Sequence, residues 1–255
     1  MDEFKGKLGN YKIIQTEDLT KTVWSEYFGE ACHNLNGAKE ETIHNYILGC
    51  HLLELFNGVD TIHLLDVGFG IGMGLSCLIE FISTHSFYSH TVQYTSIELD
   101  DLFALWSLQK FLPEIALRKT TQDELTYLEG RYKNIYIKIF LGNGRETLPI
   151  ALKKNLINNF HAIFQDPFSP KKNPILWTVE WFLFLKNSSS KNVRLATYSA
   201  SVSIRKSMID AGWIIENHQG FGNKRSMTQA SLTGVTETSL LDQLARSPAI
   251  ALHDI

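Results

Sequence analysis

The segment that most constrains the fold is an apolar run that breaks into closely spaced glycines. Residues 61–70 read TIHLLDVGFG, and the GLSCLIEFIS at 74–83 has the apolar spacing of a helix. Strands that alternate with helices predict an α/β fold with a doubly wound, mostly parallel sheet, whose ligands bind beyond the carboxyl ends of the strands. NSSSKN at 187–192 is predicted to be a polar loop. Six later apolar runs predict further strands: VQYTSIELD, IYIKIFLG, FHAIFQD, VRLATYS, WIIENHQ and SMTQASL.

The beginning of the chain lacks this regular alternation. The run GNYKIIQT has the pattern of a short strand or hairpin. Residues 39–56 place apolar side chains on one helical face, and Gly58 is expected to end that helix. We therefore expect a small N-terminal extension over residues 1–57, packed on a catalytic domain over residues 58–255.

Charge is distributed unevenly along the chain, although its net value is only −3. Residues 1–160 hold 14 Lys and Arg against 20 Asp and Glu, whereas residues 161–230 hold 9 against 4. Residues 231–255 hold one basic and three acidic residues. The acidic total disfavours a nucleic-acid partner, but the basic later third allows a local phosphate-binding surface. The alternative is a chance excess of solvated charges.

Cysteine usage and the lengths of the apolar runs limit where the chain works. Cys32, Cys50 and Cys77 are widely spaced and form no CxxC, which predicts reduced thiols and no zinc site. The nine histidines form no metal-binding spacing, so no metal is expected. No apolar run reaches the roughly 18–20 residues that cross a bilayer. The N-terminus lacks the apolar core of a signal peptide, and we expect a cytoplasmic protein.

The glycine-rich turn at residues 66–72 predicts a cofactor site. It reads DVGFGIG, so its glycines recur at every second position, unlike the GxGxxG of a dinucleotide site. The pattern resembles motif one of class I S-adenosylmethionine-dependent methyltransferases, whose loop wraps the methionine part of the cofactor. The resemblance implies a Rossmann-like fold and assigns Asp66, Gly68, Gly70 and Gly72 to binding of S-adenosylmethionine. The alternative is a glycine turn that holds no ligand.

Polar residues after the next two strands extend this predicted site. Glu98 ends the second strand, where a carboxylate can accept hydrogen bonds from both ribose hydroxyls. Asp100 and Asp101 are alternatives, because acidic residues also begin helices. Gly142 and Asn143 end the third strand, where class I enzymes often have an acidic residue that accepts from the adenine amino group. The side-chain oxygen of Asn143 can accept in the same way, although asparagine is also a common turn residue.

The loop after the fourth strand is the most informative segment for chemistry. It reads DPFSPKKNPILW from Asp166 to Trp177, and its three prolines restrict the backbone. A carboxylate at this open end of the sheet faces both cofactor and substrate, which makes Asp166 the candidate catalytic residue. The alternative is an aspartate that caps or turns the chain in a proline-rich connection.

This loop is similar to the D-x-F-x-P-x-K-N-P-x-x-W signature of the MnmC/MnmD family of tRNA wobble-uridine methyltransferases. The resemblance covers most of the chain from about residue 25, although the family often has Asn where Gly74 stands and Asp where Asn143 stands. Other segments that resemble the family are Tyr27-Phe28, Gly37–Glu41, ATYSA at 196–200, IRKSMIDAGW at 204–213, GFGNKRSM at 220–227 and ARSPAI at 245–250.

The family resemblance implies a reaction and a set of roles. The reaction is methylation of the exocyclic amine of 5-aminomethyl-(2-thio)uridine at the tRNA wobble position, giving the 5-methylaminomethyl product. A primary alkylamine is mostly protonated at neutral pH, so Asp166 would orient the amine and accept its proton. We expect Phe168 to stack on the uracil ring and the basic residues to contact phosphates. Core packing of Phe168 and solvated surface charges are the alternatives. The expected contacts to the anticodon loop are Phe168, Lys171, Lys172, Asn173, Lys224 and Arg225.

Two other functions fit the same cofactor site. An aminopropyltransferase also binds a sulfonium nucleoside on this fold and acts on an amine, but the KKNPILW segment counts against it. A non-catalytic S-adenosylmethionine-binding module is the second alternative. Bifunctional members of the family add a flavin-dependent oxidase domain, which we do not expect in a chain that ends at Ile255. Separate enzymes would then make the aminomethyl-uridine substrate.

Overall fold

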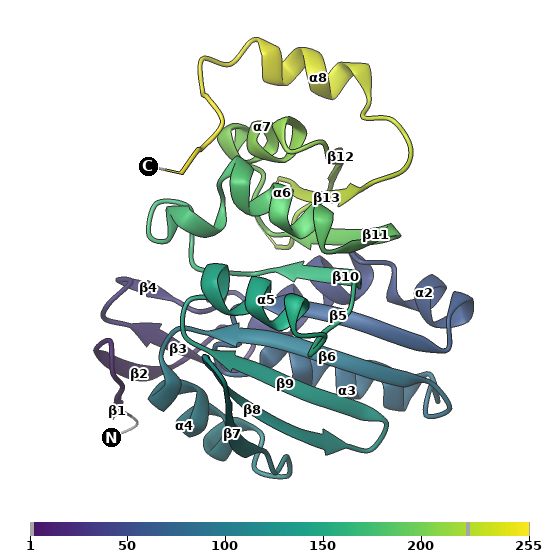
Figure 1. The fold of residues 1–255 in the computed structure, drawn as a ribbon. Helices are drawn as coiled ribbons and strands as arrows, with labels where there is room; N and C mark the ends of the chain where they lie inside the picture. The colour runs from purple at the N-terminus through teal and green to yellow at the C-terminus, as the bar shows by residue number, and fades with distance from the viewer. Residues whose placement is uncertain (1–2, 223–224, 255) are drawn as a thin grey trace.

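The computed structural model describes residues 3–222 and 225–254, and its main sheet has nine strands (Figure 1). Their spatial order is β12-β13-β11-β10-β5-β6-β9-β8-β7. The five neighbours from β11 to β9 are parallel, and antiparallel pairs follow at both edges. The strands are β5 (Thr61–Val67), β6 (Thr91–Glu98), β7 (Arg118–Gln122), β8 (Leu125–Tyr132), β9 (Ile135–Leu141), β10 (Phe160–Gln165), β11 (Ser189–Thr197), β12 (Ile214–His218) and β13 (Met227–Ser231).

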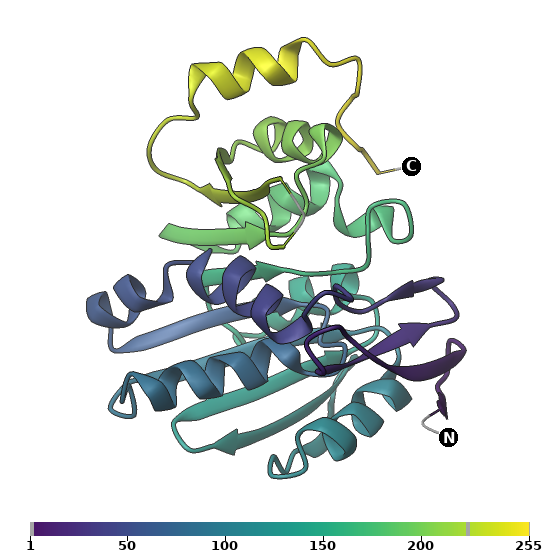
Figure 2. The ribbon, with the colours of Figure 1, turned by 180° about the vertical axis from the view of Figure 1, so that it is seen from behind.

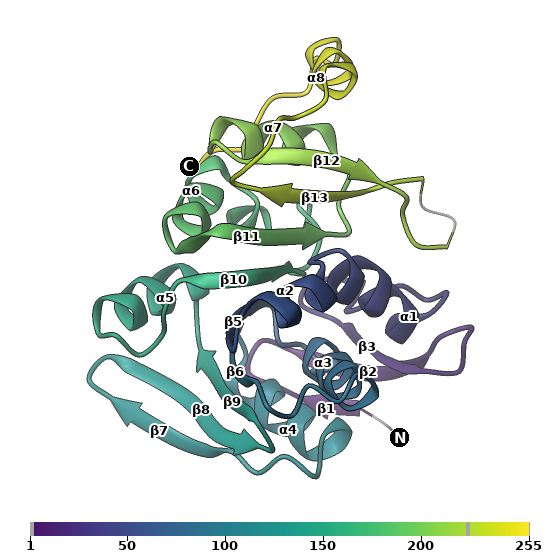
Figure 3. The same cartoon turned by 90° about the vertical axis from the view of Figure 1, so that its right-hand side faces the viewer.

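Helices cover both faces of the main sheet, which confirms the doubly wound fold that the alternation predicts (Figures 2 and 3). Ile62 and Leu64 of β5 pack with the first layer, while Leu65 and Val67 pack with the second, because successive strand residues point to opposite faces. The first layer is α1 (Ala38–Thr42), η1 (Ile43–Leu48), α2 (Leu52–Gly58), α3 (Met73–Thr84) and α4 (Asp101–Phe111). The second layer is α5 (Gly144–Lys153), α6 (Val179–Asn187), α7 (Val202–Asp210) and α8 (Thr238–Ala245).

The helix predicted over residues 39–56 is divided into three pieces. A π-helix, η1, follows α1 directly, and His51 then adopts a left-handed conformation (φ 52°) before α2 begins. Cys50 and Leu52 flank that break and are fully buried, so core packing holds it in place. The third piece, α2, ends at Gly58, as predicted. η1 and α2 contribute side chains to the core of the first layer, and α1 packs against α3. The division after residue 57 remains a proposal.

The N-terminal extension is a four-stranded antiparallel sheet, larger than the strand or hairpin that the sequence predicts. It packs on α4, where the Tyr11 ring stacks on Phe103 with centroids 3.9 Å apart. Asp100 caps α4 and also accepts hydrogen bonds from the Tyr11 hydroxyl at 3.1 Å and the Leu8 amide at 2.8 Å. Asp100 therefore joins the two sheets. The strands are β1 (Glu3–Lys5), β2 (Asn10–Gln15), β3 (Lys21–Ser25) and β4 (Glu30–Ala31).

Other sequence expectations differ from the structure at polar segments. The polar loop predicted at 187–192 is wrong, because β11 begins at Ser189 and continues through Lys191. The sequence does not predict the hairpin β7–β8, since β7 (RKTTQ) is a polar edge strand without an apolar pattern. Within residues 3–222 and 225–254, no helix is long and apolar enough to cross a membrane.

Candidate active site

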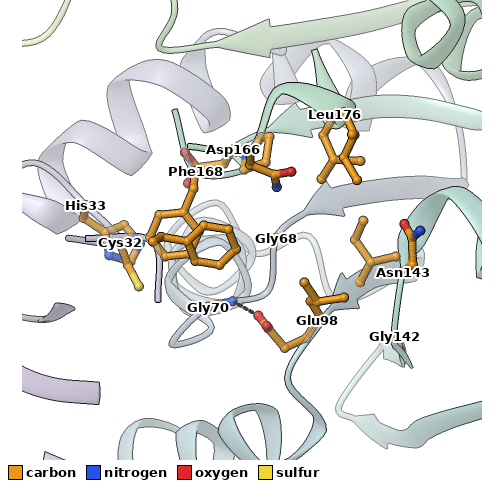
Figure 4. Close-up of a pocket in the computed structure, with 17 residues that line it drawn as sticks. Cys32, His33, Gly68, Gly70, Glu98, Gly142, Asn143, Asp166, Phe168 and Leu176 are labelled. Carbon is orange, nitrogen blue, oxygen red and sulfur yellow. Dashed lines mark hydrogen bonds between the residues drawn. The ribbon is translucent and has the colours of Figure 1, made fainter. Parts of the chain in front are cut away.

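A pocket opens at the carboxyl ends of β10, β5, β6 and β9, where such a sheet binds its ligands. The space between its walls is about 840 Å³, which includes the solvent at its open mouth. Figure 4 shows that both predicted ends of the site, around Glu98 and around Asp166, belong to this one pocket. The lining residues are Phe28, Cys32, His33, Gly68, Gly70, Ile97, Glu98, Leu99, Gly142, Asn143, Gly144, Asp166, Pro167, Phe168, Asn173, Ile175 and Leu176.

The glycine turn after β5 presents bare backbone to the pocket. Gly68 and Gly70 have φ of 101° and 55°, in the left-handed region that favours glycine. A Cβ on Gly68 would lie 3.1 Å from the backbone oxygen of Asp166, so the two loops approach each other too closely for a side chain. A Cβ on Gly70 would meet nothing within 4 Å, which leaves open space beside its backbone. This surface fits the cofactor that the glycine pattern predicts.

Glu98 lies beside this turn with its carboxylate at the pocket (Figure 4). Its Oε2 accepts from the Gly70 amide at 3.0 Å, and its Oε1 accepts from the Asp100 amide at 3.1 Å. Burial raises the pKa of Glu98 to about 7. Hydrogen bonds from ribose hydroxyls would favour the charged form of this carboxylate and so oppose the effect of burial.

Gly142 and Asn143 line the pocket beyond β9. The Asn143 side-chain oxygen accepts from the Arg145 amide at 3.1 Å and so caps α5. That oxygen has a second lone pair with which it can accept from an adenine amino group. The Arg145 guanidinium donates to the backbone oxygen of Ile175 at 2.7 Å. Arg145 therefore contacts both Asn143 in this part of the pocket and the loop that follows β10.

Asp66 and Gly72 do not line the pocket but lie behind the glycine turn. Asp66 is 3% exposed and accepts a hydrogen bond from the Tyr94 hydroxyl, and burial raises its pKa to about 7. A Cβ on Gly74 would lie 2.4 Å from Asp66 Oδ2, so glycine at this position makes room for the carboxylate. Gly72 begins α3 in a left-handed conformation (φ 78°). Asp66 and Gly72 therefore support the glycine turn on its side away from the pocket.

Asp166 is the first residue after β10 and lines the pocket. Its Oδ1 accepts a hydrogen bond from the hydroxyl of Tyr46 on η1. The Tyr198 hydroxyl and the Trp177 indole N–H donate to the next two backbone oxygens of the loop, each at 2.9 Å. Aromatic donors from three segments thus fix this carboxylate and its loop.

The N-terminal sheet completes the pocket, which the sequence does not predict. Phe28, from the turn between β3 and β4, stacks on Phe168 with ring centroids 4.0 Å apart. Cys32 and His33 follow β4 and line the same side (Figure 4). The His33 Nδ1 lies 2.8 Å from the Thr22 hydroxyl, and burial lowers the pKa of His33 to about 4, so its ring is neutral at pH 7.

The residues that are expected to contact tRNA and that the structure describes differ in whether they line this pocket. Asn173 lines it, whereas the neighbouring Lys171 and Lys172 are exposed to solvent. Arg225 is also exposed, and Lys224 lies outside the described residues. In the part of the chain that the structure describes, no three His, Cys, Asp or Glu residues are grouped to hold a metal ion.

Comparison with known proteins adds independent support to the fold and the cofactor site. A sequence profile of S-adenosyl-L-methionine-dependent methyltransferases matches residues 107–233. The crystal structure of MnmC2 from Aquifex aeolicus is 26% identical in sequence and superimposes with a TM-score of 0.77. That match covers 98% of this chain and 81% of the Aquifex chain.

Curated relatives match over most of this chain but over less of their own length. An uncharacterized protein of Methanocaldococcus jannaschii is 25% identical over 224 residues, which is 86% of this chain and 58% of that protein. The bifunctional tRNA 5-methylaminomethyl-2-thiouridine biosynthesis protein MnmC of Nitrosospira multiformis is 26% identical over 228 residues, covering 83% of this chain and 36% of the relative. With the glycine turn and the fold, these matches confirm the resemblance found in the sequence. The chain is a class I S-adenosylmethionine-dependent methyltransferase that is similar to the methyltransferase part of MnmC proteins.

Proposed function

We propose that the chain methylates the exocyclic amine of 5-aminomethyl-(2-thio)uridine at the wobble position of tRNA. The observation that carries this proposal is the continuity of the pocket. The glycine turn and Glu98 line one part of it, and Asp166 and Phe168 line another. A methyl donor and an aromatic base that carries an amine can therefore occupy neighbouring parts of the same space.

The residues around the glycine turn would hold the donor. When bound, S-adenosylmethionine supplies an electrophilic methyl group attached to a sulfonium. The backbone of Gly68 and Gly70 would lie against the methionine part, Glu98 would accept from the ribose hydroxyls, and Asn143 would accept from the adenine amine. These contacts fix the direction in which the methyl group faces, and positioning of this kind supplies much of the acceleration in a displacement reaction.

Asp166 would handle the proton of the amine. The amine nitrogen attacks with its lone pair, the bond from carbon to sulfur breaks, and that electron pair stays on sulfur as a thioether. An ammonium has no lone pair to give, and an alkylamine is mostly protonated at neutral pH. The Asp166 carboxylate can bind the ammonium, orient it and take a proton from it, which is the work of a general base.

The aromatic side of the pocket would hold the uracil ring. Phe168 lines the pocket and packs face to face on Phe28, so one flat apolar surface lies next to Asp166. Stacking of a base on an aromatic side chain contributes about 1–3 kcal/mol and tolerates either sulfur or oxygen on the base. The name of the Nitrosospira relative, which refers to 5-methylaminomethyl-2-thiouridine in tRNA, supports this choice of substrate.

The test is a methylation assay with the purified protein and tRNA whose wobble uridine carries the aminomethyl group. Digestion and mass spectrometry should then show 5-methylaminomethyl-uridine, formed only when the methyl donor is present. Wobble nucleosides from cells that lack this protein should conversely accumulate the aminomethyl form. If the donor binds but the aminomethyl nucleoside is returned unchanged, the proposed reaction is wrong.

A further inference from the structure

A buried tyrosine lies behind the candidate catalytic carboxylate. Tyr46 is only 2% exposed, and its hydroxyl donates a hydrogen bond to Asp166 Oδ1. Burial and the neighbouring Asp166 both raise the pKa of Tyr46 well above its ordinary value. The hydroxyl therefore remains protonated and acts as a donor to the carboxylate over the whole physiological pH range.

The fold brings Tyr46 to this place through an unusual piece of helix. Tyr46 lies in the π-helix η1, and π-helical turns occur often at functional sites. A Cβ on Gly49 would lie 3.0 Å from the Ala196 side chain, so the end of η1 approaches β11 too closely for a larger residue. The Tyr46 ring also packs against Phe164 of β10, with centroids 5.5 Å apart. Three elements thus fix the position of its hydroxyl.

We propose that Tyr46 is a positioning residue, which holds Asp166 in its charged form and turned toward the substrate amine. The inference rests on the proposed function, because it needs a substrate whose ammonium Asp166 receives. A donor to one carboxylate oxygen stabilises the anion and restricts its rotation. Without that donor the carboxylate would protonate at higher pH, and its rotation would be less restricted.

Other titratable groups also surround this carboxylate and have to be separated from the effect of Tyr46. Among the residues that the structure describes, those near enough to interact with its charge include Cys32 beside the N-terminal sheet, Tyr94 of β6, Tyr46 of η1 and Tyr198 after β11. Glu41 of α1 lies near Tyr46 and Tyr198. A Tyr46→Phe variant leaves all the other groups in place and removes one oxygen atom, so a change between it and wild type belongs to that hydroxyl.

The first measurement is the pH dependence of kcat/KM for tRNA methylation by wild type and Tyr46→Phe. A hydrogen bond to a charged group corresponds to about one to two pKa units, so the acid limb should move up by that amount. At pH values below the limb the variant should be slower by about 10–100-fold, and the loss should shrink as pH rises. The matched control is Tyr94→Phe, which also removes a buried tyrosine hydroxyl from an aspartate, Asp66, outside the pocket. The Tyr94 hydroxyl stays protonated and donates to Asp66, so it places no charge near Asp166, and the acid limb of Tyr94→Phe should stay in place.

The second measurement does not depend on activity. Carbon NMR of protein labelled in its aspartate carboxyl groups, with the Asp166 signal assigned from Asp166→Asn, gives the pKa of Asp166 directly. That pKa should be higher in Tyr46→Phe than in wild type, even if the substrate proves to be another amine. An unchanged pKa together with an equal loss of rate at every pH would overturn the proposal and leave Tyr46 a packing residue. A wild type that is inactive on aminomethyl-uridine tRNA would contradict the proposed function instead.

Discussion

Two tyrosine–aspartate pairs lie near the carboxyl ends of the neighbouring strands β5 and β10, and they differ in what covers the aspartate. Tyr94 donates to Asp66, which is still inside β5 and is covered by the first turn of α3 at Gly74. Tyr46 donates to Asp166, which is one residue beyond β10 and lines the pocket. The same pair of side chains therefore belongs to the core in one place and to the active site in the other.

The difference shows that the position of an aspartate relative to the strand end decides its role. A residue within a strand points at one face of the sheet, where helices cover it. A residue just beyond a parallel strand points into the space at the carboxyl edge, where ligands bind. We therefore expect changes at Asp166 to affect catalysis, changes at Glu98 to affect cofactor affinity, and changes at Asp66 to affect stability.

The largest effect is expected for Asp166→Asn, which keeps the shape of the side chain but removes its charge and basicity. Loss of a general base costs about 10²–10⁴-fold in rate, whereas the free energy of unfolding should change by roughly 0.5 kcal/mol or less. Single-turnover methylation and thermal melting of the same preparations provide both numbers. A folded variant with nearly wild-type turnover would give Asp166 a purely structural role, like that of its counterpart Asp66 in β5. Recovery of the rate as pH approaches the pKa of the amine would support the proton-transfer role.

The sequence predicts the half of the pocket that is built from local patterns. The strands appear as apolar runs, and the turn at Gly68 and Gly70 appears as glycines directly after one of them. Glu98 and Asp166 follow from the rule that ligands bind at the carboxyl ends of parallel strands. These features depend on neighbours in the chain, so the residues alone carry the information.

The other half of the pocket depends on contacts between segments that are distant in the chain, and no local sequence pattern predicts such contacts. Phe28 and Phe168 are 140 residues apart in the chain yet stack in the structure. Tyr46 bonds to a carboxylate 120 residues away. The run GNYKIIQT and the family-like Tyr27-Phe28 pair mark the N-terminal sheet in the sequence, but neither indicates a place in the pocket. The glycine motif assigns Asp66 to cofactor binding because that residue adjoins the turn, although the structure places it outside the pocket.

The next largest effect is expected for Glu98→Gln on cofactor affinity. Its carboxylate should accept from ribose hydroxyls, and losing a charged acceptor should weaken binding of S-adenosylmethionine by about 10–100-fold. Since the pKa of Glu98 is about 7 without ligand, wild-type affinity should increase as pH rises through 7, because the carboxylate must lose its proton to bind best. The glutamine variant should lack this dependence. Calorimetry of donor and demethylated product across pH measures both effects, and identical pH profiles would assign the ribose to another group.

A smaller effect, on stability only, is expected for Asp66→Asn. Burial raises the folded pKa of Asp66 from 3.8 to about 7, so the folded state holds this proton more tightly than the unfolded chain does. The stability that this proton contributes is present at low pH and is lost as pH rises through 7. The neutral asparagine avoids this loss, and its advantage over wild type should grow to on the order of 1–2 kcal/mol between acid and alkaline pH. Denaturant unfolding at both pH values measures the difference, and a constant difference would contradict the assignment.

The smallest effect is expected for exposed lysines at the rim of the pocket, whose charges solvent screens more than it screens the charges of buried groups. Lys171 and Lys172 are exposed, and the Lys172 ammonium lies 3.3 Å from where a Cβ on Gly29 would stand, close to the aromatic side of the pocket. If these lysines contact phosphates, reversing both to glutamate should weaken tRNA binding and make its dependence on salt shallower. The log–log slope should fall by about 0.7 for each phosphate of a single strand that a lysine no longer neutralises. Exposed charges that meet no phosphate should leave the slope unchanged.

The control for this last prediction is a second double variant, which changes the net charge by the same amount but at the opposite end of the sheet. Arg131 and Lys133 are exposed at the turn between β8 and β9, which lies at the end of the sheet away from the pocket (Figure 1). Binding of tRNA by both double variants, measured over a series of salt concentrations, separates a local contact from the effect of total charge. An equal loss of affinity in the two variants would mean that tRNA responds to net charge alone. A loss confined to Lys171→Glu/Lys172→Glu would place the RNA backbone beside the loop that carries Asp166, because a phosphate contact acts only where the phosphate lies.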